Sequence, residues 1–465
     1  MKYIKLAYIG GGSKAWARVF MNDLALSEGI SGEIALYDID LEAAERNRQI
    51  GQRINNHPDV LSRWDYVVYE DLESALAGAD FVACSILPGT FDEMHSDVHE
   101  PEAYGIFQPV GDTVGPGGVL RAMRTVPLYE GFAKAIAKCC PNAWVINLTN
   151  PMTACVRTLY DVFPNIKAFG CCHEVFHAQD FLCCVVAEEL GVPRPDRHEM
   201  LVDASGINHF TWITEATWQG QDALALLPGF MEKYYERGYC EHKGAAPEDF
   251  RNDPFRYGNK VKMDLYRRFG ALGAAGDRHL VEFMDRSWYL SDRNAPEQWL
   301  YHLTTVDFRR KDQQQKIQRS RAIAEGTMPV TLTRSDEELV QLMKAILGFG
   351  TVVSNANTVN RGQMADLPLG TIVETNHVFS ENAVKPIVAN PLPAGAAALV
   401  ARNSRNIELT CQGIRQRNLN TIFQAFAAQP LCAGLGISDA EALFVRMVKN
   451  TSKFLEPYYD LGQLL

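Results

Sequence analysis

The sequence has no long hydrophobic run, no excess of positive charge and no cysteine pattern of a disulfide-stapled domain. Its apolar stretches are too short to cross a bilayer and no cleavable leader precedes the first expected strand, so we expect a cytoplasmic protein. The net charge of −11 argues against nucleic acid and anionic membranes as partners, since both require a basic surface. An odd number of cysteines, 11, favours reduced thiols.

The chain of 465 residues exceeds the size of one typical hydrophobic core, so two tightly joined domains are expected. Hydrophobic residues make up 47% and charged residues 22%, as in an ordinary globular protein. No internal repeat or low-complexity linker separates the two halves. We expect residues 1–200 to form one domain and residues 201–465 a second that packs against it.

Strand-like and helix-like segments alternate in the first domain. Short apolar runs predict strands at residues 3–9, 33–37, 66–69, 80–87, 144–148 and 166–171, with helical spacing at 16–26 and 72–77. The alternation predicts an α/β fold with a Rossmann-like, doubly wound parallel sheet. Beyond residue 200, helical patterns at 260–269, 335–347, 407–427 and 439–455 and a strand at 370–374 predict a mixed α+β domain.

A glycine-rich turn follows the first expected strand. Residues 10–15, GGGSKA, fit the pattern Gly-x-Gly-x-x-Ala, whose glycines permit a tight turn and close approach of a pyrophosphate to a helix N-terminus. Asp38 ends the second strand, where a carboxylate accepts hydrogen bonds from the ribose hydroxyls of NAD. The pattern predicts NAD binding, with a plain tight turn as the alternative. The cofactor-binding residues would be Gly10, Gly12, Ser13 and Asp38.

Further polar residues follow the later strands. Asn150 and Cys172 come after the strands at 144–148 and 166–171, and the carboxyl ends of parallel strands meet at one edge of a sheet. We therefore expect both to approach the crevice that contains Asp38. Cys172 and His209 offer a thiolate and an imidazole, which could share a metal in an open site that substrate oxygens complete. From spacing alone, two buried inert residues are the alternative.

Other candidate residues have more than one interpretation. Asp112 begins a glycine-rich loop that either closes over a substrate or is a structural connection. Asp264 and Tyr266 are two positions apart on a helix and face different ways, so at most one points at a site. Arg278 and His279 either bind an anion or cap a turn. A lone histidine such as His173 is more often structural.

Together, these residues resemble the family 4 glycoside hydrolases, which need NAD and a divalent metal. The resemblance extends over the opening turn and residues 115–127, 147–151, 172–175, 206–210 and 355–374. In that family the four residues that start at the metal-ligand cysteine follow the substrate class. Here they are Cys-His-Glu-Val, which looks like the version of the α-galacturonidase subgroup. The version in α-galactosidases and α-glucosidases has Ser in place of Glu174.

The resemblance implies a reaction unlike that of most glycosidases. NAD oxidises carbon 3 of the sugar, a base removes the proton on carbon 2, and the glycosidic oxygen is eliminated. Water then adds, and NADH reduces the ketone back. A divalent metal, with Mn²⁺ expected, stabilises the enediolate through the oxygens on carbons 2 and 3.

The resemblance also implies residue roles. Cys172 and His209 would hold the metal, His173 would assist the leaving group, and Asp112 matches an acidic position near the active site. The base stays open between two residues of the segment 260–269. The remaining implied roles are Asp264 or Tyr266 as the base, Asn150, His173 and Arg278 as sugar contacts, and Arg278 or Arg361 as the partner of a substrate carboxylate.

Two other functions stay open at this point. One is an α-galactosidase, α-glucosidase or α-glucuronidase of the same family. The other is an NAD-dependent dehydrogenase of malate type, because lactate and malate dehydrogenases share the expected sheet topology. In each case the expected partner is a small molecule, an α-linked uronide or hexoside for the glycosidases. The resemblance further implies a homodimer or homotetramer.

Overall fold

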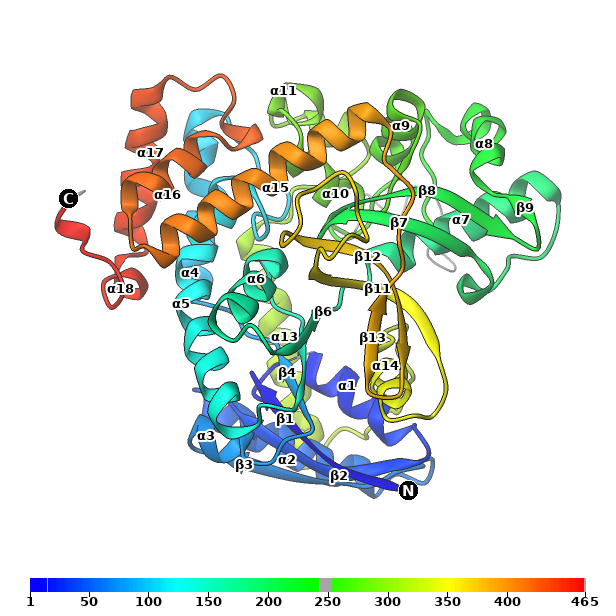
Figure 1. Cartoon of the computed structure of the whole chain (residues 1–465), viewed down its shortest axis with the longest axis vertical. Coiled ribbons are helices and arrows are strands. Elements are labelled where there is room, and N and C mark those ends of the chain that lie inside the picture. The colour runs from blue at the N-terminus through cyan, green and yellow to red at the C-terminus, as the bar shows by residue number, and fades with distance from the viewer. Residues whose placement is uncertain (15, 242–252, 464–465) are drawn as a thin grey trace.

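The computed structural model describes residues 1–14, 16–241 and 253–463. Ala15, the last position of the glycine-turn pattern, lies outside the described residues. The described strands form one mixed sheet in the order β10-β8-β7-β12-β11-β6-β5-β4-β1-β2-β3, with β9 paired to β8 and β13 to β12. The N-terminal strands lie at the bottom of Figure 1 and the later antiparallel strands at the upper right.

The first half of the sheet is parallel and confirms the predicted α/β fold. Its strands follow the spatial order β3-β2-β1-β4-β5-β6, which is the order of dinucleotide-binding sheets. Because helices cover both faces, these strands read as apolar runs and were visible in the sequence. Their bounds are β1 Lys2–Ile9, β2 Ile30–Tyr37, β3 Trp64–Tyr69, β4 Phe81–Cys84, β5 Trp144–Asn147 and β6 Lys167–Gly170.

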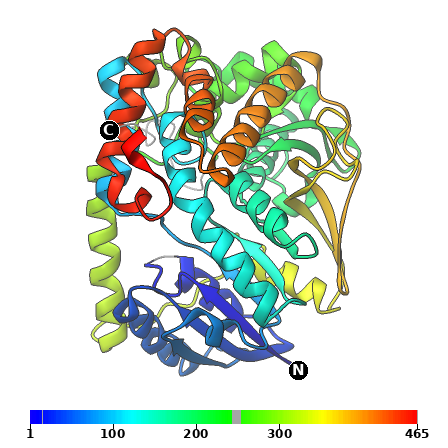
Figure 2. The ribbon, with the colours of Figure 1, turned by 60° about the vertical axis from the view of Figure 1, so that its left-hand side comes forward.

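Two layers of helices sandwich the parallel half. One face packs against α1 (Trp16–Ala25), α2 (Leu41–Asn55), α13 (Val306–Glu325) and α14 (Leu339–Ile346). The other face packs against α3 (Leu72–Leu76), α5 (Gly115–Cys139) and α6 (Met152–Val162). Figure 2 shows α13, from the later part of the chain, running along the side of the N-terminal strands. The first half is thus covered by helices from both halves of the sequence.

The second half of the sheet is antiparallel. It joins the first through the pair Asn357 and Gly170, where β11 lies beside β6. The sequence predicted only part of one of these strands, because buried polar residues such as Ser205, Asn357 and Thr375 interrupt their apolar pattern. Their bounds are β7 Leu201–Ile207, β8 Phe210–Trp218, β9 Gln221–Asp222, β10 Leu272–Gly273, β11 Val352–Val359, β12 Ile372–Ser380 and β13 Ala383–Pro386.

The remaining helices pack around the antiparallel half and the start of α5. They are α4 Phe91–His99, α7 Glu174–Leu190, α8 Leu227–Tyr234, α9 Lys260–Phe269, α10 Asp277–Leu280, α11 Arg286–Tyr289, α12 Ala295–Gln298, α15 Ala394–Arg415, α16 Leu419–Ala427, α17 Ile437–Asn450 and α18 Ser452–Leu455. None of the helices formed by the described residues is long and apolar enough to cross a membrane.

Two predicted helices are each divided in the structure. The segment 407–427 contains the end of α15 and the whole of α16, because Arg417 adopts a left-handed conformation (φ 54°). The side chain of Asn418 then caps α16 by accepting a hydrogen bond from the N–H of Thr421 at 3.0 Å. The segment 439–455 is divided at Thr451 into α17 and α18. Apolar periodicity continued across both breaks, so the single-helix predictions were wrong.

Candidate active site

Asp112 lies in a tightly held loop before α5. The carboxylate of Glu282 accepts hydrogen bonds from the backbone N–H groups of Val110 (2.7 Å) and Gly111 (2.9 Å). A Cβ on Gly118 would lie 2.5 Å from the carbonyl carbon of Thr113, so only glycine permits this approach of helix and loop. These contacts fix the direction in which Asp112 points.

His209 occupies the two-residue turn between β7 and β8 in a left-handed conformation with φ 62°. Its Nδ1 lies 2.8 Å from the hydroxyl of Thr113, and that hydroxyl donates to Asp112 Oδ1 at 2.7 Å. A hydroxyl has one proton to donate, so Nδ1 of His209 must be the donor to Thr113. The Nε2 lone pair of His209 is then free for a metal ion.

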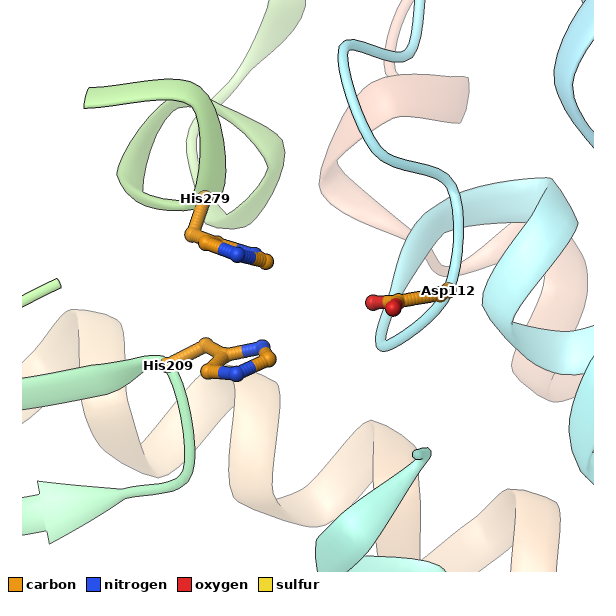
Figure 3. Close-up of side chains that lie close together, drawn as sticks. All are labelled: Asp112, His209 and His279. Carbon is orange, nitrogen blue, oxygen red and sulfur yellow. The ribbon is translucent and has the colours of Figure 1, made fainter. Parts of the chain in front are cut away.

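His279, for which the sequence suggested anion binding or a turn cap and no metal role, completes a group with Asp112 and His209. The rings of His209 and His279 lie 3.9 Å apart between centroids. One oxygen or nitrogen from each of the three residues lies within 4.8 Å of the others. Figure 3 shows the two imidazoles one above the other, with the Asp112 carboxylate facing them from the loop before α5.

The charges of this group suit a divalent cation. Burial raises the pKa of Asp112, but Arg121, together with the two imidazoles when they are protonated at low pH, holds that pKa well below its usual range. Burial lowers the pKa of His209 and brings that of His279 to about 3, so both imidazoles are neutral. One carboxylate and two neutral imidazoles form a donor set that metals such as Mn²⁺ accept.

Buried polar atoms without partners surround this group. Among the described residues, no hydrogen-bond partner is found for His279 Nδ1 or Asn150 Oδ1. Asn150 also donates to Asp112 Oδ2 at 3.3 Å. Buried polar atoms are normally satisfied in native proteins, so these atoms fit a site that is completed by a ligand.

A cavity of about 210 Å³ meets this group at His279, which lies in its lining. His173, at the N-terminus of α7, lies in its wall, with Nδ1 3.2 Å from a Glu337 oxygen. Burial lowers the pKa of His173, but Glu337 and Glu174 raise it to about 9, so the imidazole carries a proton at neutral pH. The described lining residues are His173, Glu174, His177, Phe255, Tyr257, Gly276, Arg278 and His279.

Glu174 connects two walls of the cavity. Its Oε2 accepts the backbone N–H of Gly276 at 2.6 Å, and its Oε1 lies 3.8 Å from Nε2 of both His173 and His279. Burial raises the pKa of Glu174, but the surrounding histidines hold it well below its usual range. Glu174 therefore lies between the two imidazoles as an anion, paired with the protonated ring of His173.

Arg278 reaches the cavity with part of its guanidinium uncommitted. Nη1 donates to Thr304 Oγ1 at 2.5 Å, and the guanidinium lies 5.1 Å from the ring centroid of Phe255. Nε is buried and has no partner among the described residues. Arg278 is the only Lys or Arg side chain among the described residues that line the cavity.

Tyr257 is a second residue that sequence reasoning missed. It is buried, it lines the cavity, and its hydroxyl has no partner among the described residues. A Cβ on Gly276 would lie 2.6 Å from the Tyr257 ring, so the missing side chain at Gly276 makes room for it. A single tyrosine before a helix has no distinguishing sequence spacing, so only the fold could reveal this position.

Cys172 lies close to the site but outside the group of Asp112, His209 and His279. The thiol is buried, and burial together with Glu374 and Glu174 raises its pKa. The backbone carbonyl of Cys172 accepts a hydrogen bond from Asn355 at 3.1 Å. A metal role for Cys172 stays a prediction that rests on the family resemblance.

The two predicted base candidates make contacts elsewhere. Asp264 is 1% exposed and accepts hydrogen bonds from four side chains. The hydroxyl of Tyr266 donates to the carbonyl of Leu224 at 2.9 Å. Neither Asp264 nor Tyr266 is among the described residues that line the cavity. The donors to Asp264 are Tyr235, Arg267, Arg268 and Tyr289.

This environment predicts that Asp264→Asn affects stability more than catalysis. Burial raises the pKa of Asp264, but its hydrogen-bond donors, Arg268 first, lower it below its usual value. The ionised carboxylate therefore stabilises the fold at neutral pH, and this contribution is lost as the pH falls. We expect Asp264→Asn to lower the free energy of unfolding by about 1–3 kcal/mol, as measured by urea denaturation. A collapse of kcat with unchanged stability would favour Asp264 as the base.

The glycine turn lies at the carboxyl ends of β1 and β2. Gly10 has φ 94°, and a Cβ there would lie 2.0 Å from the carbonyl oxygen of Ser85. The N–H of Gly12 donates to Asp38 Oδ2 at 2.8 Å, and the N–H of Asp40 donates to Asp38 Oδ1 at 2.9 Å. Asp38 thus stands beside the turn, as a ribose-binding carboxylate would require.

Arg361, a sequence candidate for carboxylate binding, lines a different cavity. This cavity, of about 300 Å³, includes Trp144, Tyr160 and His377 and shares none of its described lining residues with the cavity beside His279. The structure therefore leaves Arg278, of the two arginines, facing the candidate active site.

Comparison with known proteins identifies the family. The profile described as family 4 glycosyl hydrolase matches residues 5–188, and the profile of its C-terminal domain matches residues 204–432. The chain belongs to family 4 of the glycosyl hydrolases. It is therefore a glycosidase.

Individual family 4 relatives match this chain in sequence or structure over nearly its whole length. An α-galacturonidase from Thermoanaerobacterium saccharolyticum is 47% identical, over 97% of either chain. The crystal structure of lplD from Bacillus subtilis is 44% identical, with a TM-score of 0.90 over 96% of this chain and all of that chain. A 6-phospho-α-glucosidase from gut microorganisms, solved with NAD and Mn²⁺, shares the fold at 18% identity and a TM-score of 0.79, over 97% and 99% of the two chains.

Proposed function

We propose that this family 4 enzyme hydrolyses α-linked galacturonides. The relative from T. saccharolyticum is an α-galacturonidase at 47% identity. The observation that carries the proposal is Arg278 in the wall of the small cavity beside Asp112, His209 and His279. A substrate carboxylate loses its hydration on entering such a cavity and needs a cationic partner there, which Arg278 supplies.

NAD and a divalent metal are the proposed cofactors. Gly10, Gly12, Ser13 and Asp38 would hold NAD, supported by the strained turn and the strand order around it. When bound, NAD supplies a hydride acceptor for carbon 3, and the metal supplies a Lewis acid for the oxygens of carbons 2 and 3. We take Mn²⁺ as the metal. Its proposed ligands are Cys172 and His209, with Asp112 and His279 in reach.

The protein side chains would then perform the proton transfers. Tyr257, in place of Asp264 and Tyr266, takes the proton from carbon 2, because its buried hydroxyl lines the cavity without a partner. His173 gives a proton to the leaving oxygen, and Glu174 and Glu337 hold its ring in place. Asn150 contacts a sugar hydroxyl through its free oxygen.

A substrate panel tests the proposal. The purified chain is assayed with NAD, Mn²⁺ and a thiol reductant on the p-nitrophenyl α-glycosides of galacturonic acid, galactose, glucose and glucuronic acid. We expect the galacturonide to have the highest kcat/KM. A neutral sugar would leave the buried guanidinium of Arg278 without a partner, which costs about 1–3 kcal/mol of binding free energy. Equal kcat/KM for galacturonide and galactoside would refute this substrate while the family stands.

The same assay tests both cofactors. We expect EDTA to abolish turnover and Mn²⁺ to restore it, and exhaustive removal of NAD to have the same effect as removal of the metal. NADH absorbance should not accumulate with product, because the cofactor is regenerated in each cycle. Stoichiometric release of NADH would instead favour a dehydrogenase, and full turnover without either cofactor would refute the mechanism.

A further inference from the structure

Lys262 is a buried cation that the proposed mechanism does not use. It lies in the first turn of α9 with 0% of its surface exposed. Its ammonium has no hydrogen-bond partner among the described residues. Burial of a charge without a partner is costly, so such a residue in a native protein calls for a physical explanation.

The ammonium of Lys262 lies against two aromatic rings. Its Nζ is 5.4 Å from the ring centroid of Phe181 and 5.8 Å from that of Tyr257. The nearby carboxylate of Asp277 accepts the backbone N–H groups of Val261 and Lys262 at 3.2 and 3.0 Å, and not the ammonium. Of the rings that line the cavity, the ammonium of Lys262 therefore lies over that of Tyr257. Its charge also acts on Asp277 and on His177, whose pKa values it lowers.

Tyr257 needs positive charge near it to act as a base. Burial raises the pKa of Tyr257, and the carboxylates of Glu241, Glu174 and Asp277 raise it further. Arg278 lowers it, but Arg278 has a second task if it also pairs with the substrate carboxylate. A further cation beside the ring would stabilise the phenolate, because an opposite charge at this range favours the ionised form of a buried group.

We propose that Lys262 is a positioning residue for proton transfer, with its ammonium stabilising the phenolate of Tyr257 from the face of the ring. In this arrangement the proton leaves carbon 2 for the Tyr257 oxygen, and the electron pair of the broken C–H bond stays on the sugar. The inference rests on the proposed function, because the role assigned to Lys262 is to support Tyr257 as the base.

Lys262→Met tests this role, since methionine fills a similar volume without the charge. We expect kcat to fall at least tenfold, and the rise of kcat/KM with pH to move to higher pH by about 1–3 pH units. The free energy of unfolding, from urea denaturation, should stay the same or increase, because replacing a buried charge by an apolar group is often neutral or stabilising. A structural lysine would instead show reduced stability and an unchanged pH profile.

Lys260→Met is the matched control. Lys260 lies two residues earlier on the same helix and forms an ion pair with Glu236 at 3.1 Å, outside the described lining of the cavity. The same substitution there removes a charge of the same sign from α9. We expect the pH profile and kcat of the control to match those of the wild type.

A double-mutant cycle tests whether Lys262 acts through Tyr257. In a Tyr257→Phe background, Lys262→Met should cause less than a twofold further loss of kcat, because the group that it supports is gone. Full additivity of the two losses would overturn the proposal, as would wild-type kcat and pH profile in Lys262→Met. If both Lys262→Met and Lys262→Gln fail to fold, the lysine is structural and the proposal is also overturned.

These outcomes are separable from a failure of the proposed function. A wild-type chain that hydrolyses no α-galacturonide counts against the proposed function. A wild-type chain that does so, with Lys262→Met unaltered, counts only against Lys262.

Discussion

Tyr257→Phe is expected to lower kcat for α-galacturonide hydrolysis by about 10²–10⁴-fold, the usual contribution of a general base, with the fold intact. The substitution removes one oxygen, and that oxygen has no hydrogen-bond partner among the described residues. No stabilising contact of the described residues is therefore lost, and the melting temperature should not fall. Separate measurements of kcat and of thermal unfolding establish both halves of the prediction.

Hydrolysis in D₂O identifies the step that fails. Elimination removes the carbon 2 proton, so the product of the wild type should carry deuterium at carbon 2 in its NMR spectrum. Tyr257→Phe should slow this exchange in step with kcat. Tyr266→Phe is the matched control, because its hydroxyl donates to the carbonyl of Leu224. Should Tyr266→Phe lose more activity than Tyr257→Phe, the assignment of the base would be reversed.

Arg278→Met is expected to reduce kcat/KM for the galacturonide by about 30- to 1,000-fold, which corresponds to the loss of about 2–4 kcal/mol when one member of a buried charged pair is truncated. The reduction of kcat/KM for the neutral galactoside should be much smaller, so the ratio of kcat/KM for galacturonide to that for galactoside should fall. Arg278→Lys keeps the charge but loses the planar fork, and should fall between wild type and Arg278→Met.

Arg256→Met provides the comparison for Arg278. Arg256 lies 3.5 Å from a carboxylate oxygen of Asp253 and is not among the described residues that line the cavity. Its loss should leave the preference for galacturonide intact. If Arg278→Met lowers kcat/KM for both sugars by the same factor, the guanidinium supports the site as a whole and does not read the carboxylate.

The parallel half of the fold was predictable because its strands are covered on both faces and end at polar residues. Asp38, Asn150 and Cys172 were selected in this way, whereas the roles of Asp112 and His173 came from the family resemblance. The structure adds Tyr257 and the place of His279 beside Asp112 and His209, and both residues lie in segments whose sequences carry no regular spacing. Their positions depend on how α10 and the segment before α9 fold back onto the β7–β8 turn, which local periodicity does not encode.

The search for the base shows, within one helix, what periodicity cannot predict. The segment 260–269 was correctly predicted as α9, and its apolar face was visible in the sequence. Which polar side chains of that helix meet the cavity depends on partners elsewhere in the chain, such as Tyr289 for Asp264 and Leu224 for Tyr266. Periodicity gives the face of a helix that is buried, but not what that face meets.

The pairing of Asn357 with Gly170 joins the two halves of the sheet and limits how the halves can be separated by protein engineering. Gly170 lies two residues before Cys172, so the seam between parallel and antiparallel strands runs beside the candidate metal site. A chain cut near residue 200 would leave β6 and β11 as open edges with unpaired N–H and C=O groups, which promote aggregation. The two halves are therefore poor candidates for exchange between relatives as separate modules, and chimeras should join outside this seam.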